Sequence, residues 1–209
     1  MGVVMKKTEQ EKVMQIFKEE WWATPIWYFY IPETQIDLNL IKKECYKEKL
    51  NNKGRVISNI NGWQSEDISI DKKRPHISNL LEKIALIIPA ILKDLGVCKE
   101  LHLTNAWINI NPKNSSNKVH IHAKSMLSGV YYVSANEDSG NIVFYNDDKL
   151  NMIYSMFVDT NNKNTCSSIK YKPETNKIIL FPSWIPHGVD INNSKEDRIS
   201  IAFNIEIKN

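Results

Sequence analysis

The chain has 209 residues, of which 42% are hydrophobic and 24% charged, and its formal net charge is +3. These values are those of an ordinary globular protein with one sizeable core, and they exclude a fibrous or disordered chain. The lysines alternate with acids, as in "IKKECYKEKL", which is typical of a solvated helix face and provides no clear nucleic-acid surface.

The cysteines and the start of the chain indicate in which cellular compartment the protein is expected. Cys45, Cys98 and Cys166 lie far apart without a CxxC spacing, which indicates reduced thiols. The first residues have no apolar segment after their lysines and so do not resemble a signal peptide. The longest apolar run, "IALIIPAIL", is too short to span a membrane. We therefore expect a cytoplasmic protein without a membrane partner.

The first hundred residues are expected to be mainly helical. Residues 8–21 open with a capping-box spacing, and residues 37–54 place apolar side chains at helical intervals before Gly54. Between them, "WWATPIWYFYIP" is broken by two prolines, as in an edge strand or an extended crossing segment. Residues 78–96 predict a buried helix that starts near its first serine and is kinked at Pro89.

After residue 100 the pattern changes to short β-branched and aromatic runs, such as "LSGVYYVSA", "KIILFPSW" and "RISIAFNIEIK". Asn, Gly, Ser, Asp and Pro separate these runs, which is typical of an antiparallel sandwich or jelly roll. We predict an α+β fold in a single domain over residues 1–209. A helical layer over residues 1–100 is expected to pack on a double-stranded β-helix, or jelly roll, over residues 101–209.

Three histidines are candidates for a metal site. His120 and His122 lie one residue apart, and in a strand such residues share a face with Cα atoms ~6.7 Å apart, close enough to reach one ion. Two half-exposed histidines at the start of a strand would give the same pattern. His187, in "ILFPSWIPHGV", follows an apolar strand and two stiffening prolines. Three protein ligands without cysteine favour a catalytic metal over structural zinc.

A carboxylate receptor is indicated in the next strand. In "RISIAFNI", Arg198, Ser200, Ala202 and Asn204 share one face of the strand. A guanidinium and a hydroxyl on an inward face can bind a carboxylate together. The alternative is a surface arginine whose stem lies along an edge strand.

The order "HIH … FPSWIPHGV … RISIAFN" resembles the iron(II)/2-oxoglutarate-dependent oxygenase superfamily, and prolyl-hydroxylase-like members in particular. "SNINGWQS" and "TPIW" resemble a group of such oxygenases from bacteria and phages. The resemblance implies three iron ligands, which are His120, His122 and His187. It also implies side chains that bind 2-oxoglutarate, namely Arg198, Ser200, Tyr132, the alternate Tyr131, and Asn109 at the other end of the co-substrate.

The same resemblance implies the reaction and its setting. Fe(II), 2-oxoglutarate and O₂ would hydroxylate an unidentified small-molecule or protein substrate, with release of succinate and CO₂. The expected location is the cytoplasm of a bacterium or of a phage-infected host cell. Trp107 and Trp184 are candidates for the substrate mouth, and an exposed strand edge would allow a homodimer.

The chain departs from the superfamily at His122, where members have a carboxylate. Besides a triad of three histidines, one of the pair could instead support a ligand, or an acid such as Glu137 or Asp138 could complete the site. Two other readings stay open. One is a three-histidine cupin without 2-oxoglutarate, in which Arg198 would have no role, and the other is a non-catalytic β-sandwich binding or structural protein.

Overall fold

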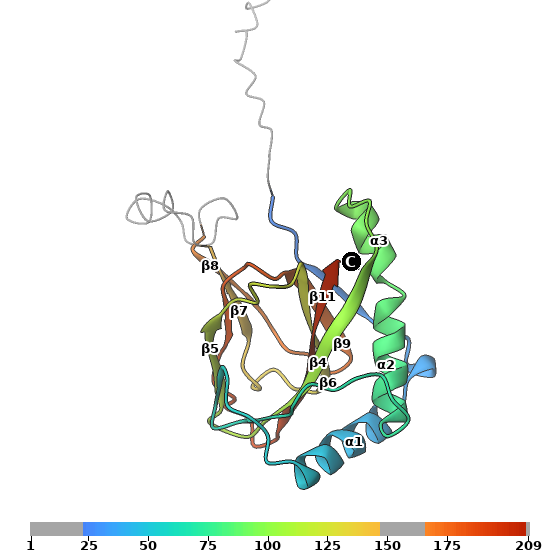
Figure 1. Ribbon diagram of the computed structural model, residues 1–209. Coiled ribbons are helices and arrows are strands. Elements are labelled where there is room, and N and C mark those ends of the chain that lie inside the picture. The colour runs from blue at the N-terminus through green and yellow to red at the C-terminus, as the bar shows by residue number, and fades with distance from the viewer. Residues whose placement is uncertain (1–22, 147–165, 208–209) are drawn as a thin grey trace, which may run out of the picture.

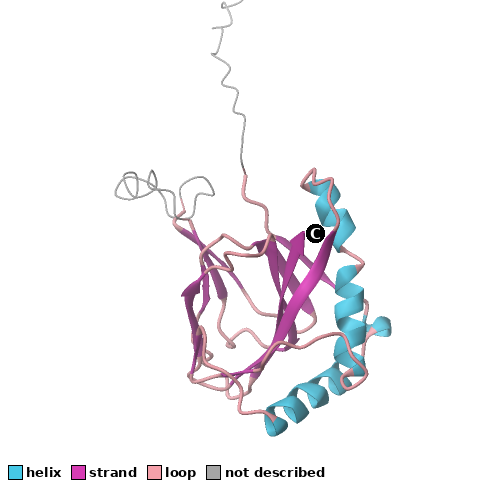
Figure 2. Cartoon of the chain, in the orientation of Figure 1, coloured by secondary structure: helices cyan, strands magenta, loops and turns pink. Residues whose placement is uncertain are grey.

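Two antiparallel β-sheets face each other, and helices cover the outer face of the larger sheet (Figure 1). The computed structural model describes residues 23–146 and 166–207. The helix predicted over residues 8–21 lies outside this part of the chain. Figure 2 shows that the helices all lie on one side of the sandwich, so the predicted combination of a sandwich and a helical layer is confirmed.

In the described part of the chain, the larger sheet has the strand order β1 (Trp27–Tyr30), β9 (Lys177–Pro182), β6 (Leu127–Ser134), β11 (Arg198–Ile207), β4 (Leu101–Asn111) and β3 (Trp63–Gln64). The smaller sheet has the order β2 (Asn59–Ile60), β5 (Ser116–His120), β10 (His187–Val189), β7 (Ile142–Tyr145) and β8 (Ser168–Tyr171). β1 is an edge strand, as predicted. The first hundred residues therefore supply edge strands to both sheets as well as the helical layer.

The first helix, α1 (Leu38–Asn51), follows a short 3-10 helix at Glu33–Gln35. Asp37 caps its N-terminus, since the carboxylate of Asp37 accepts a hydrogen bond of 3.0 Å from the backbone N–H of Leu40. After the helix ends, Gly54 adopts φ +73°, a conformation that favours glycine.

The second helix, α2 (Pro75–Ala85), starts three residues before the predicted Ser78. Proline suits the first helical position because the N–H it lacks would have no partner within the helix. The next two backbone N–H groups, of His76 and Ile77, donate to the carboxylate of Glu44 on α1 at 3.1 and 2.9 Å. A side chain of the preceding helix therefore caps α2, which the sequence pattern of α2 alone does not reveal.

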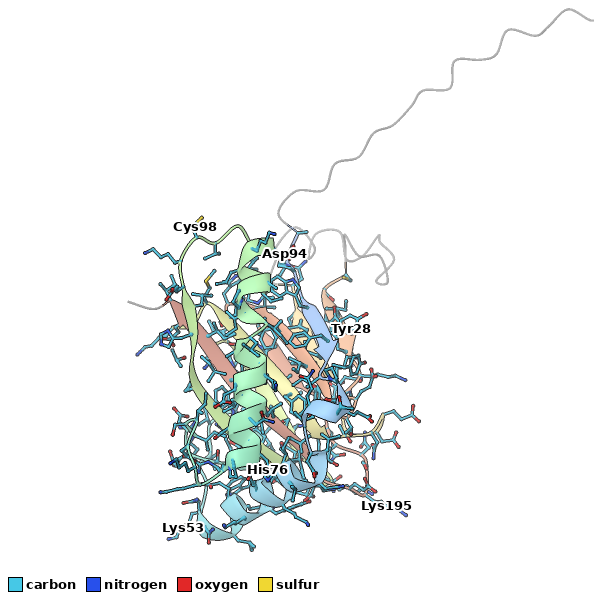
Figure 3. All side chains as sticks on the ribbon, turned by 90° about the vertical axis from the view of Figure 1, so that its right-hand side faces the viewer. Tyr28, Lys53, His76, Asp94, Cys98 and Lys195 are labelled. Carbon is cyan, nitrogen blue, oxygen red and sulfur yellow. The ribbon has the colours of Figure 1, made fainter. Side chains whose placement is uncertain are left out.

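The predicted kink at Pro89 is a break between α2 and α3 (Ile88–Asp94). By length and composition, Pro75–Asp94 could cross a membrane, although 44% of its apolar window is buried inside the structure. Its buried side chains belong to the same core as the larger sheet, as expected of a helix that covers a soluble core. Figure 3 looks onto this layer and shows His76 at the start of α2 and Asp94 at the end of α3. The carboxylate of Asp94 accepts a hydrogen bond of 2.9 Å from Trp27 on β1.

The central strands β6 and β11 separate an apolar core from a polar interior. On β11, Ile199, Ile201 and Phe203 are fully buried in the core beneath the helices. The alternate residues of β11 face the space between the sheets, because successive side chains of a strand point to opposite faces. The predicted division of this strand into two faces is confirmed.

Gly129, on β6, is expected to tolerate no side chain. A Cβ atom there would meet the ring of Phe203 and lie 3.0 Å from the side chain of Leu180, and both neighbours are buried. Overpacking of this kind costs about 1–3 kcal/mol. We therefore expect Gly129→Ala to lower the free energy of unfolding by that amount in urea denaturation. An unchanged midpoint would show that the core can shift to accept a methyl group.

Candidate active site

His120, His122 and His187 converge, since one ring nitrogen from each lies within 4.8 Å of the other two. His120 is the last residue of β5, and His187 is the first of β10, directly opposite it in the antiparallel register. His122 lies in the turn after β5, and its backbone N–H donates to the carbonyl of Ser183 at 2.9 Å.

The convergence has a different cause from the one predicted. Strand alternation does not place His120 and His122 together, because the strand ends at His120. The turn instead returns the ring of His122 to a centroid distance of 5.1 Å from each of the other two rings. The ring of His122 also stacks on Trp107, with centroids 5.6 Å apart and an interplanar angle of 18°.

Two of the three rings have one nitrogen bonded to a backbone oxygen. Nδ1 of His120 lies 2.7 Å from the carbonyl of Lys118, and Nδ1 of His187 lies 2.9 Å from the carbonyl of Ile185. The ring of His122 stacks on Trp107 and lines the cavity together with Asn204. A carbonyl accepts the proton of one nitrogen, so the other nitrogen keeps its lone pair free, as in metal-ligating histidines.

The protonation states also suit metal ligation. Burial lowers the pKa of His187 to about 3 and, with the nearby ring of His120, lowers the pKa of His122 to about 4. Burial likewise lowers the pKa of His120. All three imidazoles are therefore neutral near pH 7, and a neutral imidazole is the form that binds a metal. The donor set fits a divalent metal ion with open coordination positions.

No carboxylate joins these histidines among the residues that the structure describes. The acids considered from the sequence lie in the turn after β6. Glu137 pairs with Lys172 at 3.8 Å, and Asp138 uses its backbone carbonyl to bind the N–H groups of Asn193 and Ser194. Neither acid lines the cavity that contains the histidines, so the structure does not support the carboxylate alternative.

The histidines line a cavity of about 320 Å³ between the sheets. On the larger sheet, Tyr132, Ser200 and Asn109 form a row across three adjacent strands, because Ser200 is the register partner of the other two. All three are buried and line the cavity. Oδ1 of Asn109 has no hydrogen-bond partner among the described residues. Burial raises the pKa of Tyr132 to about 12, so its hydroxyl is protonated and can donate.

Arg198 lines the same cavity and is only 2% exposed. Its guanidinium donates to the carbonyl of Ser139 at 2.7 Å, and it lies 3.5 Å from the side-chain oxygen of Asn117. No carboxylate among the described residues forms an ion pair with it. Burial lowers the pKa of Arg198, yet an arginine stays charged. Within the part of the chain that the structure describes, the cavity therefore contains a buried cation that forms no ion pair.

Two of the other candidates lie outside the cavity. Tyr131 points into the core beneath the helices and donates to Asn176 at 3.2 Å, so the alternate strand register does not occur. Trp184 is 62% exposed and does not line the cavity, whereas Trp107 is buried and does. Of the remaining histidines, His76 lies on the helical layer and His102 is exposed on β4.

Several cavity residues were not assigned a role from the sequence. Arg55, Asp67 and Asn105 line the cavity near His122, together with Asn204. Strand alternation places Asn204 on the inward face, and Asn105 is its register partner on β4. Asp67 and Arg55 come from loop segments for which no periodic pattern exists.

Comparison with known proteins agrees with this geometry. Residues 105–204 match the model of a family described as "Putative 2OG-Fe(II) oxygenase". No curated protein matches the sequence. A prolyl-4-hydroxylase from Pseudomonas putida has a TM-score of 0.64 at 13% identity, over 90% of this chain and 95% of that chain.

Two further solved structures share the fold. One is a prolyl hydroxylase from Trichoplax adhaerens in complex with a peptide of hypoxia inducible factor, with a TM-score of 0.63 at 15% identity, over 87% of this chain and 83% of that one. The other is a viral collagen prolyl hydroxylase from Paramecium Bursaria Chlorella virus-1 with 2-oxoglutarate. Its TM-score is 0.54 at 13% identity, over 85% of this chain and 94% of that one.

The two-sheet sandwich with its internal histidine cluster is a jelly roll of the oxygenase type, which confirms the predicted fold class. The family match over residues 105–204, together with the shared fold, supports the iron(II)- and 2-oxoglutarate-dependent oxygenase superfamily for this part of the chain. Fe(II), 2-oxoglutarate and O₂ follow as its cofactor and co-substrates. The resemblance stated from the sequence is confirmed, and the family match favours an oxygenase over a cupin or a non-catalytic sandwich.

Proposed function

We propose that the protein is a hydroxylase in which His120, His122 and His187 hold Fe(II), while Arg198 and Ser200 hold the distal carboxylate of 2-oxoglutarate. One observation carries the proposal. The buried guanidinium of Arg198 has no carboxylate partner among the described residues, and it lines the same cavity as the histidine cluster. A buried charge is costly unless it is paired, so this cation is suited to an anionic ligand.

When bound, Fe(II) would supply the oxidative decarboxylation of 2-oxoglutarate by O₂ to succinate and CO₂, with the second oxygen atom of O₂ inserted into a C–H bond of the substrate. The chain itself positions the reactants and shields them from water. Ser200 and the protonated hydroxyl of Tyr132 lie in one cross-strand row and can donate to the same carboxylate as Arg198. Asn109, on the other side of Ser200, would orient the remaining part of the co-substrate.

The substrate is proposed to be a small molecule or a protein in the cytoplasm. Two apolar side chains that line the cavity, Ile57 and Ile121, are also 62% and 49% exposed, so they reach from the cavity to the surface. Apolar side chains at an opening suit an uncharged portion of a substrate and give no surface for a phosphate backbone. Trp107, stacked on His122, would lie beside the reacting carbon. Trp184 is too exposed for that role in this structure.

An anaerobic titration tests the proposal. Purified protein would receive Fe(II) and then 2-oxoglutarate, and the visible charge-transfer band of the chelated co-substrate would be recorded. The proposal predicts a band that saturates at one equivalent, together with slow release of CO₂ on admission of O₂. Iron binding without a band would contradict the assignment of Arg198, and failure to bind either would contradict the hydroxylase.

Tyr132→Phe is expected to weaken the binding of 2-oxoglutarate without changing the affinity for iron. The variant loses one hydrogen bond to a carboxylate, which is worth about 1.5–3 kcal/mol, or roughly a 10- to 150-fold rise in the dissociation constant. The same titration measures it. Tyr131→Phe, in which only the bond to Asn176 is lost, is the matched control and should leave the co-substrate affinity unchanged.

A further inference from the structure

We propose that Asn117 is a positioning residue that holds the guanidinium of Arg198 through an uncharged contact, so that the positive charge stays available to the distal carboxylate of 2-oxoglutarate. The inference rests on the proposed role of Arg198 in binding that carboxylate. Asn117 lines the same cavity, but it belongs neither to the histidine cluster nor to the cross-strand row that contains Ser200.

The hydrogen bonds of Arg198 occupy both ends of its guanidinium. Nη1 donates to the backbone carbonyl of Ser139 at 2.7 Å and to that of Gly140 at 3.4 Å. Nη2 donates to Oδ1 of Asn117 at 3.5 Å. A guanidinium has five N–H donors, so these contacts leave two of them for a ligand. Two N–H groups are what a carboxylate needs for a bidentate contact.

The acceptors around Arg198 are all uncharged. Two are backbone carbonyls and the third is a side-chain amide. In the described part of the chain no carboxylate forms an ion pair with Arg198, and Asp190 pairs instead with Lys170 at 3.0 Å. A neutral acceptor orients a guanidinium without cancelling its charge, whereas a carboxylate at the same place would compete with an anionic ligand. Asparagine at position 117 is therefore suited to hold a cation that binds an anion.

The orientation of the Asn117 amide is determined by Ser58. Nδ2 of Asn117 donates to Oγ of Ser58 at 3.2 Å, so Oδ1 faces the other way, toward Arg198. The reverse orientation would place an NH₂ group against the guanidinium, donor against donor. Ser58 is itself fixed, because its backbone carbonyl accepts from the N–H of Lys118 at 2.9 Å.

The backbone of Asn117 is held on both sides. Asn117 lies on β5 between β2 and β10, and its register partners are Asn59 and Val189. A side chain on a paired strand is positioned more precisely than one on a loop. Arg198 extends from the larger sheet and Asn117 from the smaller one, so both sheets together set the position of the guanidinium.

The decisive variant is Asn117→Asp, because it is isosteric and turns the uncharged contact into an ion pair. Oδ1 stays in place, and the hydroxyl of Ser58 can rotate to donate to the second oxygen. We expect a stronger contact with Arg198 and yet a loss of affinity for 2-oxoglutarate of more than about 30-fold, because the new carboxylate takes the place of the co-substrate. Asn117→Leu removes the contact and should lower the affinity about tenfold.

Lys118→Gln is the matched control. It changes the net charge by the same amount as Asn117→Asp, at the neighbouring residue, but the side chain of Lys118 is exposed and does not line the cavity. Its affinity for 2-oxoglutarate should equal that of the wild type. A second control is 2-oxovalerate, which has a methyl group in place of the distal carboxylate and should bind equally to all four proteins. Anaerobic titration of the iron-loaded proteins measures both acids through the charge-transfer band.

A second measurement needs neither iron nor co-substrate. The ¹⁵N NMR signals of a guanidinium report how fast it rotates about the Nε–Cζ bond, and those of Arg198 are assigned by their absence in Arg198→Met. We expect slow rotation, with separate signals for the two Nη atoms, in the ligand-free wild type and in Lys118→Gln. In Asn117→Leu the rotation should be about ten times faster, because one hydrogen bond that opposes it is lost.

Equal affinities of Asn117→Asp and Lys118→Gln for 2-oxoglutarate would overturn the inference, as would an equal loss of affinity for 2-oxovalerate. Unchanged rotation in Asn117→Leu would show that Asn117 does not hold Arg198. Failure of the hydroxylase proposal gives a different result. In that case the wild type forms no band with 2-oxoglutarate, whereas the rotation of the guanidinium still tests the contact between Asn117 and Arg198.

Discussion

Replacing His187 by alanine is expected to abolish iron binding. His187 contributes one of three convergent nitrogens. Because it is only 4% exposed, a side chain from the surface cannot take its place as a ligand unless the fold changes. Changes to partners of metal ligands already cost about 10- to 100-fold in affinity, and loss of a ligand should cost more than about 100-fold. Equilibrium dialysis with Fe(II) under argon measures the effect, and the charge-transfer band should be lost with it.

His102→Ala is the matched control for that variant. His102 is exposed on β4, is not part of the histidine cluster and does not line the cavity. Its iron affinity should equal that of the wild type. Retention of iron by His187→Ala with the wild-type dissociation constant would remove His187 from the metal site and would leave the cluster without three ligands.

Replacing Arg198 by methionine is expected to weaken the binding of 2-oxoglutarate, while iron still binds. Truncation of one partner of a buried, hydrogen-bonded charge pair costs about 2–5 kcal/mol, or roughly a 30- to several-thousand-fold loss of affinity. Arg198→Lys should recover only part of it, because an ammonium group cannot contact both carboxylate oxygens in the same planar geometry. Titration of the iron-loaded variants with 2-oxoglutarate measures both.

The stability of Arg198→Met separates a binding role from a structural one. Among the described residues Arg198 pairs with no acid, so an apolar replacement should leave the stability of the ligand-free protein unchanged or raised. Arg74→Met should show the reverse. Arg74 pairs with Glu48 at 2.9 Å and with Asp71, and it lies outside the cavity, so its loss should lower stability but not co-substrate affinity. Equal destabilisation by both variants would indicate that Arg198 mainly supports the fold.

Strand alternation accounts for most of what the sequence predicted correctly. It placed Arg198 and Ser200 on the inward face of β11, and the alternative of a surface arginine is wrong because Arg198 is buried. It also made Tyr132 and Tyr131 mutually exclusive, since neighbours in a strand face opposite ways. Only the structure shows which of the two faces the cavity.

The remaining features depend on contacts between distant segments. The start of α2 is set by Glu44, from another helix, and the position of His122 by a turn held to Ser183. Asp67 lies in a segment without periodicity, 38 residues from Asn105, whose side-chain amide donates a hydrogen bond to it. A pattern within one element contains no information about such partners, so these parts of the site could not be predicted.

The register of His120 against His187 has a consequence for the smaller sheet. These two residues are directly opposite on β5 and β10, where the pairing of the strands becomes irregular after a few residues. A metal ion held by both rings would therefore act as a cross-link between these two neighbouring strands. A ligand that binds only the folded state raises stability by about 2.7 kcal/mol at one hundred times its dissociation constant. Slower amide hydrogen exchange in β5 and β10 would then accompany metal loading, and the folding of this sheet would depend on the supply of the metal.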